Sequence, residues 1–230
     1  MMSVDIDHSP HHDQNGRSIK VRKEGSNTED TAVLSEIKRV LREEGEAIAR
    51  LERELDSDSL LETARALAAC KGRIILSACG TSAMAARKIA HSLCCIERPA
   101  LFLIPSDAVH GGLGVLQPGD ILILISKGGN TGEVTRLIPA CKSKGALLIG
   151  VSENPASQLA READIYLRVG VEREPDAFNM LATASTLAVI AAFDAICVAL
   201  MKLTGYTKEQ FAVIHPGGAV GDRLLERNSQ

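Results

Sequence analysis

The distribution of apolar and charged positions separates a polar tail, two leading helices and a region of alternating short segments. Residues 1–30 are polar and have no repeating period, so they cannot bury enough apolar surface to offset the entropy of ordering them. After this expected tail, apolar residues recur at helical spacing and predict an amphipathic helix over residues 33–55. A second, shorter helix is expected over residues 58–69, where Ser57 or Asp58 can cap its start.

Beyond the leading helices, short apolar runs alternate with stretches of helical spacing. The apolar runs predict strands at residues 73–77, 100–104, 121–125, 146–151 and 164–167. The stretches between and after them predict helices at residues 82–95, 131–144, 156–162 and 180–203. Short buried strands separated by helices are typical of a parallel sheet covered on both faces. The pattern therefore predicts one doubly wound, flavodoxin-like α/β domain with a five-stranded parallel sheet over residues 31–226, followed by a short tail at 227–230.

Composition and charge exclude several classes of function. The 230 residues are 45% hydrophobic and 24% charged, enough to fill one sizeable core. A net charge of −3 gives no basic surface for a phosphate backbone, so nucleic acid is not expected as a partner. The six cysteines form no CxxC pair, which argues against a zinc site or a disulfide framework. With no apolar signal core at its start, the chain is expected to be a reduced, cytoplasmic protein without metal or other cofactor.

One apolar segment, residues 181–203, has the length of a membrane span. It contains Asp194 and Lys202 together with many small residues, and it has no belt of Trp or Tyr. We therefore interpret it as a central helix packed on the sheet, and we expect no contact of the protein with a membrane.

Two loops that follow predicted strands share one kind of chemistry. Residues 77–83, SACGTSA, leave the first strand through Gly80, and residues 126–133, SKGGNTGE, leave the third strand through Gly129 and enter a helix at Thr131. Glycine allows close backbone approach, and free N–H groups and hydroxyls at a helix start attract an anion. Taken singly, either loop is typical of an ordinary turn. Together, at the carboxyl ends of one parallel sheet, they favour a phosphate site.

Other phosphate motifs are absent from the sequence. It contains neither the GxGxxG fingerprint of dinucleotide binding nor the GxxxxGK[ST] of a P-loop, so nicotinamide and ATP chemistry lose support.

Several stretches resemble one known family. SKGGNTGE resembles the serine-rich phosphate loop of the sugar isomerase (SIS) domain, and ACGTS resembles the first loop in the isomerase half of glucosamine-6-phosphate synthase. HPGGAVGDRLL, residues 215–225, and AVHGGLGVLQPGDILILIS, residues 108–126, resemble the final segment and the histidine loop of the arabinose-5-phosphate isomerase family. The resemblance covers roughly Leu34 to Leu225 and implies a SIS fold that binds a sugar phosphate.

The resemblance implies an aldose–ketose isomerase of the arabinose 5-phosphate/ribulose 5-phosphate type, working through a cis-enediol. By position, Glu174 matches a family glutamate thought to act as the base, and His110 and His215 match active-site histidines. Without the resemblance, Glu174 would be interpreted as a solvated loop residue. For His215, a residue that simply caps a turn is the alternative to a functional role. The implied residues around the ligand and its phosphate are Gly80, Thr81, Ser82, Ser126, Lys127, Gly129, Asn130, Thr131, Ser185 and Thr186.

The family also implies a homodimer or homotetramer, built through the leading helices, in which His215 completes a neighbour's site. The chain has no counterpart of the paired CBS modules that many members carry, so we expect no nucleotide-sensing half.

The chain departs from the family at polar positions. Thr81 stands in place of a lysine, Gly128 in place of a serine, Asn130 in place of a glutamate, and Gly112 in place of an aspartate. Lys127 stands where the family commonly has asparagine, and its ammonium either replaces the missing charge or points to solvent. Two alternatives to the pentose phosphate isomerase stay open: a non-catalytic phosphosugar-binding or sensor module, and a phosphosugar isomerase or lyase acting on a hexose phosphate.

Overall fold

The structure, a computed structural model, describes residues 26–217. The expected tail at 227–230, most of the expected tail at 1–30 and residues 218–225 of the HPGGAVGDRLL motif lie outside the described residues. The chain divides into two compact units, residues 1–41 and residues 42–230.

The first helix, α1 (Ser26–Glu54), begins earlier than the apolar pattern indicated. The prediction began where the apolar repeat begins, but the first turn of a helix needs no apolar residue, and Glu29 there interacts favourably with the helix dipole. In the first unit, most apolar side chains of the predicted stripe are exposed, among them Ile37 and Leu41. In the second unit, Ala47 and Leu51 of the same helix are buried.

Five parallel strands form a single sheet in the order β2-β1-β3-β4-β5, which confirms the predicted fold class. The strands are β1 (Ile74–Ala78), β2 (Ala100–Phe102), β3 (Ile121–Ile125), β4 (Leu147–Ser152) and β5 (Ile165–Arg168). The prediction was right for all of β3 and misplaced the ends of the others by one or two residues. The register pairs Ile74 with Ile121 and Ala78 with Ile125, so β1 and β3 end at the same level. Their following loops therefore leave the sheet side by side.

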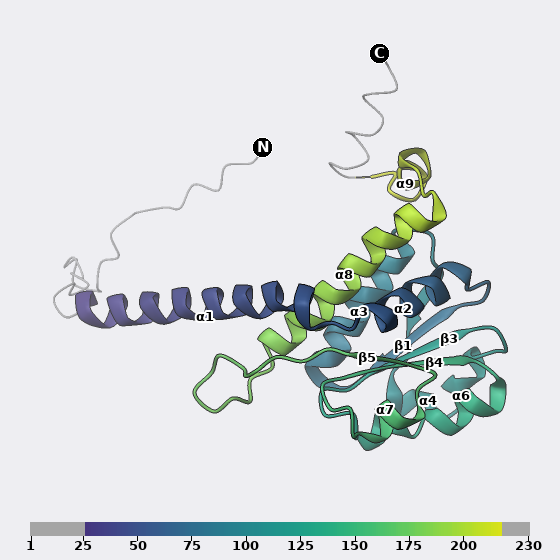
Figure 1. The fold of residues 1–230 in the computed structure, drawn as a ribbon, viewed down its shortest axis with the longest axis horizontal. Helices are drawn as coiled ribbons and strands as arrows, with labels where there is room; N and C mark the ends of the chain where they lie inside the picture. The colour runs from purple at the N-terminus through teal and green to yellow at the C-terminus, as the bar shows by residue number, and fades with distance from the viewer. Residues whose placement is uncertain (1–25, 218–230) are drawn as a thin grey trace, which may run out of the picture. The chain divides into compact units, whose positions relative to one another are not determined.

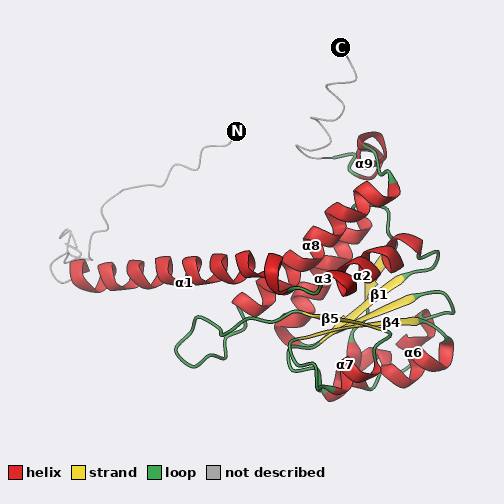
Figure 2. Cartoon of the chain, in the orientation of Figure 1, coloured by secondary structure: helices red, strands yellow, loops and turns green. Residues whose placement is uncertain are grey.

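Helices cover both faces of the sheet, as Figures 1 and 2 show. The first face is covered by α2 (Ser57–Ala69), α3 (Gly80–Cys94) and α8 (Ala184–Thr204). The second face is covered by α4 (Pro105–Ala108), α5 (Gly132–Thr135), α6 (Ile138–Lys144) and α7 (Gln158–Glu162). Because side chains alternate along a strand, Ile74 and Leu76 join the core under α8 while Ile75 joins the other core. The remaining short elements are η1 (Gly112–Val115) and α9 (Lys208–Ile214).

The apolar helix α8 is a core helix, as the sequence predicted. It is long and apolar enough to cross a membrane by length and composition alone. Its inner side, however, carries Phe193 and Leu200 into the core and packs against α2 and α3. Asp194, the acidic residue within it, pairs with Lys88 of α3.

Two local predictions need correction. The single helix expected over residues 131–144 is two helices, because Pro139 has no N–H and its ring would clash with the preceding turn of a continuous helix. Pro139 lies instead in the first turn of α6, where no N–H is needed. The cap of α2 is Asp56, whose carboxylate accepts the Ser59 N–H at 2.8 Å, and not Ser57 or Asp58.

Candidate functional site

The candidate site lies where neighbouring strands send their connections to opposite faces of the sheet. After β1 the chain enters α3 on the first face, and after β3 it enters α5 on the second. Because β1 and β3 are adjacent and end at the same level, their loops flank one crevice at the carboxyl edge of the sheet. Ligands of doubly wound folds bind at such a point. The fold therefore brings together the two loops that the sequence singled out.

The loop after β3 is closed by hydroxyl groups. Ser126 is buried, and its Oγ lies 2.8 Å from Thr131 Oγ1 and accepts the Gly129 N–H at 3.1 Å. The N–H groups of Gly128, Asn130 and Thr131 donate to no acceptor within residues 26–217. The loop thus presents main-chain donors together with hydroxyls, a chemistry suited to an anion.

The same loop is fastened to α7. Gly129 O accepts the Leu159 N–H at 3.1 Å, and Asn130 Oδ1 accepts the Gln158 N–H at 2.8 Å. The side-chain oxygen of Asn130 therefore holds the start of α7, and its main-chain N–H has no acceptor among the described residues. Gly129 has φ +71°, and a Cβ there would lie 2.1 Å from Ser157 Oγ, so this position requires glycine.

The loop after β1 opens directly into α3. Gly80 adopts φ +58°, and Thr81 and Ser82 occupy the first turn of this 15-residue helix. The N-cap residue, Cys79, makes no side-chain cap hydrogen bond, which leaves the first-turn N–H groups available.

A small cavity of about 20 Å³ joins the loops to the start of α8. Ser82 and Ser126 line it from the two loops, and Ser185 and Thr186 line it from α8. Its volume has room for about one water molecule. Ser152, which ends β4, also lines it and was missed in the sequence, where the only signal was a polar residue directly after an apolar strand.

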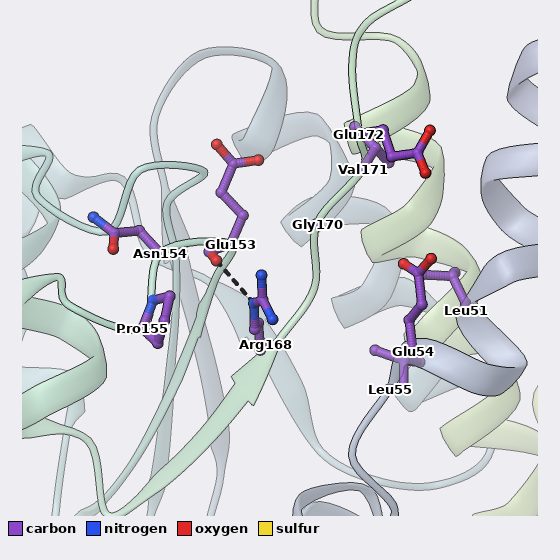
Figure 3. Close-up of a pocket in the computed structure, with 10 residues that line it drawn as sticks. All are labelled: Leu51, Glu54, Leu55, Glu153, Asn154, Pro155, Arg168, Gly170, Val171 and Glu172. Atoms are coloured by element: carbon purple, nitrogen blue, oxygen red, sulfur yellow. Dashed lines mark hydrogen bonds between the residues drawn. The ribbon is translucent and has the colours of Figure 1, made fainter.

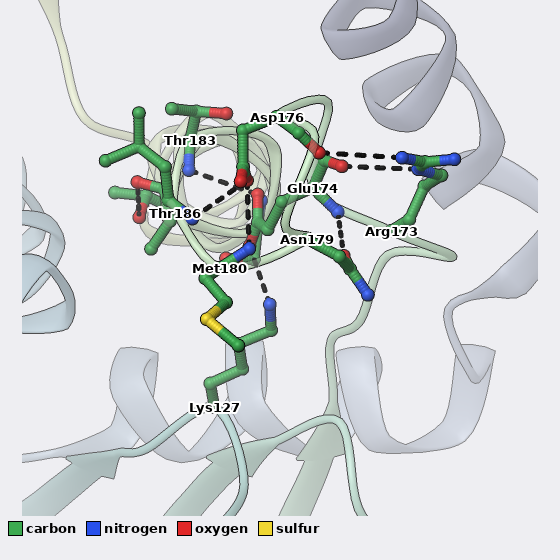
Figure 4. A network of polar contacts seen from close by, with 11 residues as sticks. Lys127, Arg173, Glu174, Asp176, Asn179, Met180, Thr183 and Thr186 are labelled. Atoms are coloured by element: carbon green, nitrogen blue, oxygen red, sulfur yellow. Dashed lines mark hydrogen bonds and ion pairs between the residues drawn. The ribbon is translucent and has the colours of Figure 1, made fainter.

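Glu174 is fully buried, so the interpretation as a solvated loop residue is wrong. Its Oε1 accepts from Lys127 Nζ at 2.7 Å, and its Oε2 accepts the N–H groups of Thr183 at 3.1 Å and Ser185 at 3.3 Å. Figure 4 shows the Lys127 side chain rising from the strand-end loop to this carboxylate. The carboxylate thereby links the loop after β3 to the start of α8, where the helix dipole favours a negative charge.

Opposing effects set the pKa of Glu174. Burial acts to raise this pKa, but hydrogen bonds from Lys127, from the Ser185 hydroxyl and from the N–H groups of Thr183 and Ser185 outweigh burial and lower it. The carboxylate is therefore ionised at neutral pH.

The segment that carries Glu174 is shaped by its own polar residues. Asn179, at φ +58°, accepts the Glu174 N–H through Oδ1 at 2.6 Å. The Asp176 carboxylate accepts N–H groups from Phe178, Met180 and Leu181, each at 2.9 Å. These contacts fix Glu174 inward while Phe178 and Met180, 79% and 81% exposed, face solvent.

His110 lies at the same edge of the sheet but outside the small cavity. It follows α4, which packs against α5, and its side chain is exposed. A Cβ at Gly112 would lie 2.8 Å from Asp107 O, so the close backbone approach beside His110 explains why glycine stands there.

His215 lies far from the crevice of its own chain. It caps α9, stacks on Phe211 with ring centroids 3.9 Å apart, and places Nδ1 3.0 Å from Phe211 O. The helix α9 follows the carboxyl end of α8, whereas Ser185 lies at the amino end of α8 (Figure 1). A helix of 21 residues is about 30 Å long. The structure thus does not bring His215 to Glu174 within one chain.

A larger cavity of about 570 Å³ does not suit a phosphate (Figure 3). Its charged lining residues are Glu54, Glu153 and Glu172 against the single cation Arg168. Arg168 donates through Nε to the main-chain oxygen of Glu153 at 3.1 Å. A surplus of carboxylates repels a phosphate dianion, so the crevice between the loops after β1 and β3 is the better anion site.

No metal centre competes with this crevice in the described part of the chain. Within residues 26–217, no group of three or more His, Cys, Asp or Glu side chains is placed to hold a metal ion.

Known proteins share this architecture. Residues 67–199 match the family model of the SIS domain. Over 202 residues the chain is 36% identical to the arabinose 5-phosphate isomerase KpsF of Escherichia coli, which covers 88% of this chain and 64% of that protein. The match to the arabinose 5-phosphate isomerase KdsD of Yersinia pestis covers 58% of that protein. The chain thus spans less than two thirds of the length of these curated relatives.

Solved structures agree with the family match. A candidate sugar-phosphate isomerase from Listeria monocytogenes is 61% identical, with a TM-score of 0.80 over 81% of this chain and 98% of that one. The Escherichia coli CFT073 protein c3406 in complex with arabinose 5-phosphate is 28% identical, with a TM-score of 0.78 over 81% of this chain and 99% of that one.

The two adjacent glycines of the loop after β3 should differ sharply in their tolerance of a methyl group. We expect Gly129→Ala to lower the free energy of unfolding by about 2 kcal/mol or more, because it combines a positive φ with a clash against Ser157. Gly128→Ala is the matched control, since nothing lies within 4 Å of its added Cβ, and it should stay within about 0.5 kcal/mol. Denaturant unfolding measures both, and equal midpoints for the two variants would contradict the described loop.

Proposed function

The chain belongs to the SIS domain family, and we propose from this premise that it is an aldose–ketose isomerase of a sugar phosphate, of the arabinose 5-phosphate/ribulose 5-phosphate type. The observation that carries the proposal is the buried, ionised carboxylate of Glu174 beside a crevice of anion donors. The printed activity of its curated relatives, arabinose 5-phosphate isomerase, supports the same substrate class.

The reaction needs a base near the sugar carbonyl and an anchor for the phosphate. The loops after β1 and β3 bind the phosphate through hydroxyls and main-chain N–H groups. Glu174 then removes the proton from the carbon next to the aldehyde, which gives a cis-enediol, and returns it to the former aldehyde carbon to form the ketose. A second group, for which we propose His110, transfers a proton between the two oxygens or assists ring opening.

A second candidate, a phosphosugar-binding or sensor module without catalysis, is favoured by one specific observation. Lys127 and two main-chain N–H groups occupy both oxygens of Glu174, which leaves the base engaged in the described state. In addition, Thr81 and Asn130 stand at the positions where the related isomerases have a lysine and a glutamate. A hexose phosphate as the substrate of an isomerase or lyase is the third candidate.

We further propose a cytoplasmic homodimer or homotetramer with shared sites. All six cysteines are free, in keeping with a reducing compartment. The distance between His215 and the crevice of its own chain favours a role for His215 in the site of a neighbouring copy.

Replacing the base should strongly reduce proton exchange without loss of ligand binding. We expect Glu174→Gln to lower solvent deuterium incorporation into arabinose 5-phosphate by about a hundredfold or more, because the amide keeps the shape but cannot accept the proton. Glu172→Gln is the control, since Glu172 lies on the same segment but forms only an exposed pair with Arg50 at 3.3 Å. A panel of pentose and hexose phosphates, followed by NMR in deuterated water, identifies the substrate. Full activity of Glu174→Gln would remove the proposed mechanism, and exchange with no sugar phosphate would favour the binding module.

The phosphate should dominate recognition by the crevice. We expect arabinose 5-phosphate to raise the melting temperature and arabinose to leave it unchanged, because only a ligand that binds the native state stabilises it. Thr131→Ala should reduce the shift, while Thr204→Ala at the far end of α8, where the hydroxyl donates to Leu200 O at 2.9 Å, should not. Equal shifts with both sugars would show that the loops do not bind phosphate.

Shared sites can be tested by complementation. Protomers with Glu174→Gln and protomers with His215→Ala should each be inactive alone, and mixing them should restore part of the activity, because some interfaces then pair an intact glutamate with an intact histidine. Sedimentation must first show an oligomer that exchanges subunits. If exchange is demonstrated and activity does not return, His215 has no role in a neighbour's site.

A further inference from the structure

We propose that Lys127 is a positioning residue that holds Glu174 in an ion pair while the site is empty and moves to the phosphate of an incoming ligand, which frees one carboxylate oxygen for proton transfer. Because this release matters for catalysis only if Glu174 is a base, the catalytic part of the role rests on the proposed isomerase function.

The two partners of the pair differ in freedom of movement. The Lys127 backbone is fixed, since its O accepts the Glu153 N–H at 3.0 Å and the preceding Ser126 N–H donates to Val151 O at 3.0 Å. Its side chain, however, is 38% exposed, whereas that of Glu174 is 0% exposed. An ammonium on a flexible four-carbon stem can therefore change partners while the carboxylate stays in place.

The ammonium occupies the carboxylate oxygen that a substrate needs. Glu174 Oε2 already accepts two N–H groups at the start of α8, from Thr183 and Ser185. Oε1 accepts from no main-chain donor within residues 26–217 and is covered by Lys127 Nζ at 2.7 Å. A carboxylate acts as a base through an oxygen within reach of the substrate proton, so Lys127 must leave before Oε1 can act.

Space and charge both favour the transfer. The cavity of about 20 Å³ cannot admit a sugar phosphate unless a lining side chain moves, and Lys127 is the one charged residue among the described residues that line it. Lys127 also belongs to the anion-binding loop itself, next to Ser126. A phosphate group that carries a charge close to −2 attracts the ammonium more strongly than a carboxylate with a charge of −1 does. The ligand can shift the lysine only through this difference in contact, so the phosphate group, rather than the sugar, is the trigger.

Among the residues that the structure describes, no charged side chain other than Lys127 contacts the carboxylate of Glu174. Arg173 donates through Nε to the main-chain oxygen of Glu174 at 3.3 Å, and Arg50 pairs with Glu172 at 3.3 Å. Asp176 accepts N–H groups of its own segment. When Lys127 leaves, the donors at the start of α8 remain to oppose the effect of burial, which raises the pKa of Glu174. The pKa therefore rises, and the carboxylate becomes a stronger base.

A double-mutant cycle with inorganic phosphate tests the transfer without any catalysis. Calorimetry at pH 8 compares the wild-type protein with Glu174→Gln, Lys127→Met and the double variant. We expect Lys127→Met to weaken phosphate binding by about ten- to hundredfold, since a charge-assisted contact is lost. Glu174→Gln should tighten binding by about three- to tenfold, because the ammonium no longer has to leave its partner. In the Lys127→Met background, Glu174→Gln should have a much smaller effect.

The background comparison separates the transfer from simple repulsion between Glu174 and phosphate. Repulsion alone would give Glu174→Gln the same effect, or a larger one, in the Lys127→Met background, and this result would overturn the proposal. Lys142→Met is the matched control for net charge, because Lys142 forms a remote pair with Glu162 at 2.8 Å and should not change phosphate affinity. Lys127→Gln replaces Lys127→Met if circular dichroism shows that the latter does not fold. No phosphate binding by the wild-type protein, or unchanged binding by both neutral Lys127 variants, would also overturn it.

Failure of the proposed function would be recognised separately. A coupled response to phosphate without proton exchange on any sugar phosphate leaves Lys127 in its role and removes the isomerase. If exchange is found, the acid limb of kcat/KM, which reports the empty site, should lie at lower pH than the limb of kcat, which reports the complex. In Lys127→Met the separation between the two limbs should shrink, because the pKa of Glu174 in the empty site is then no longer lowered by the lysine, an outcome that a purely structural lysine would not produce.

Discussion

The buried carboxylate of Glu174 is the constraint on which the geometry of the site depends. Taking a charge out of water costs several kcal/mol unless donors replace the lost hydration. Here the donors come from Lys127 after β3 and from the first turn of α8, segments separated by more than fifty residues. Any large shift of α8 relative to the sheet would leave the charge without partners. The same interaction therefore fixes the core helix in place and keeps Glu174 ionised.

The bounds of the strands and helices could be only partly predicted from the sequence. Runs such as ILILI at 121–125 are apolar at every position, which marks a strand buried on both faces, and the structure has this strand at the same residues. The break between α5 and α6 was missed because residues 131–144 have helical spacing throughout, and Pro139 was not weighed against it. The start of α1 was missed for the opposite reason, since a helix without an apolar face leaves no periodic signal.

The site shows the same division between local and long-range information. The loops at Gly80 and Gly129 could be recognised because glycine and hydroxyls after a strand form a local pattern. The burial of Glu174 could not, since it depends on Asn179 and on Lys127, and nothing near Glu174 in the charged run at 172–176 indicates an interior position. The same limit applies to Asn130, whose side chain turns to α7 through a contact 28 residues away. Sequence thus located the two loops of the candidate site, whereas only the fold supplied the partner of Glu174.

The charge of the two cavities explains why the smaller one is the better site. The larger cavity offers volume, but its three carboxylates face one guanidinium, so a dianion would have to enter against the local field. The smaller one has almost no free volume, yet it combines hydroxyl groups with a lysine that is committed to a carboxylate. In the proposed transfer, binding there exchanges one ion pair for another, so the new contact with phosphate offsets the cost of separating Lys127 from Glu174. A neutral sugar offers no such compensation, and we therefore expect the electrostatics of the crevice to favour the phosphorylated form.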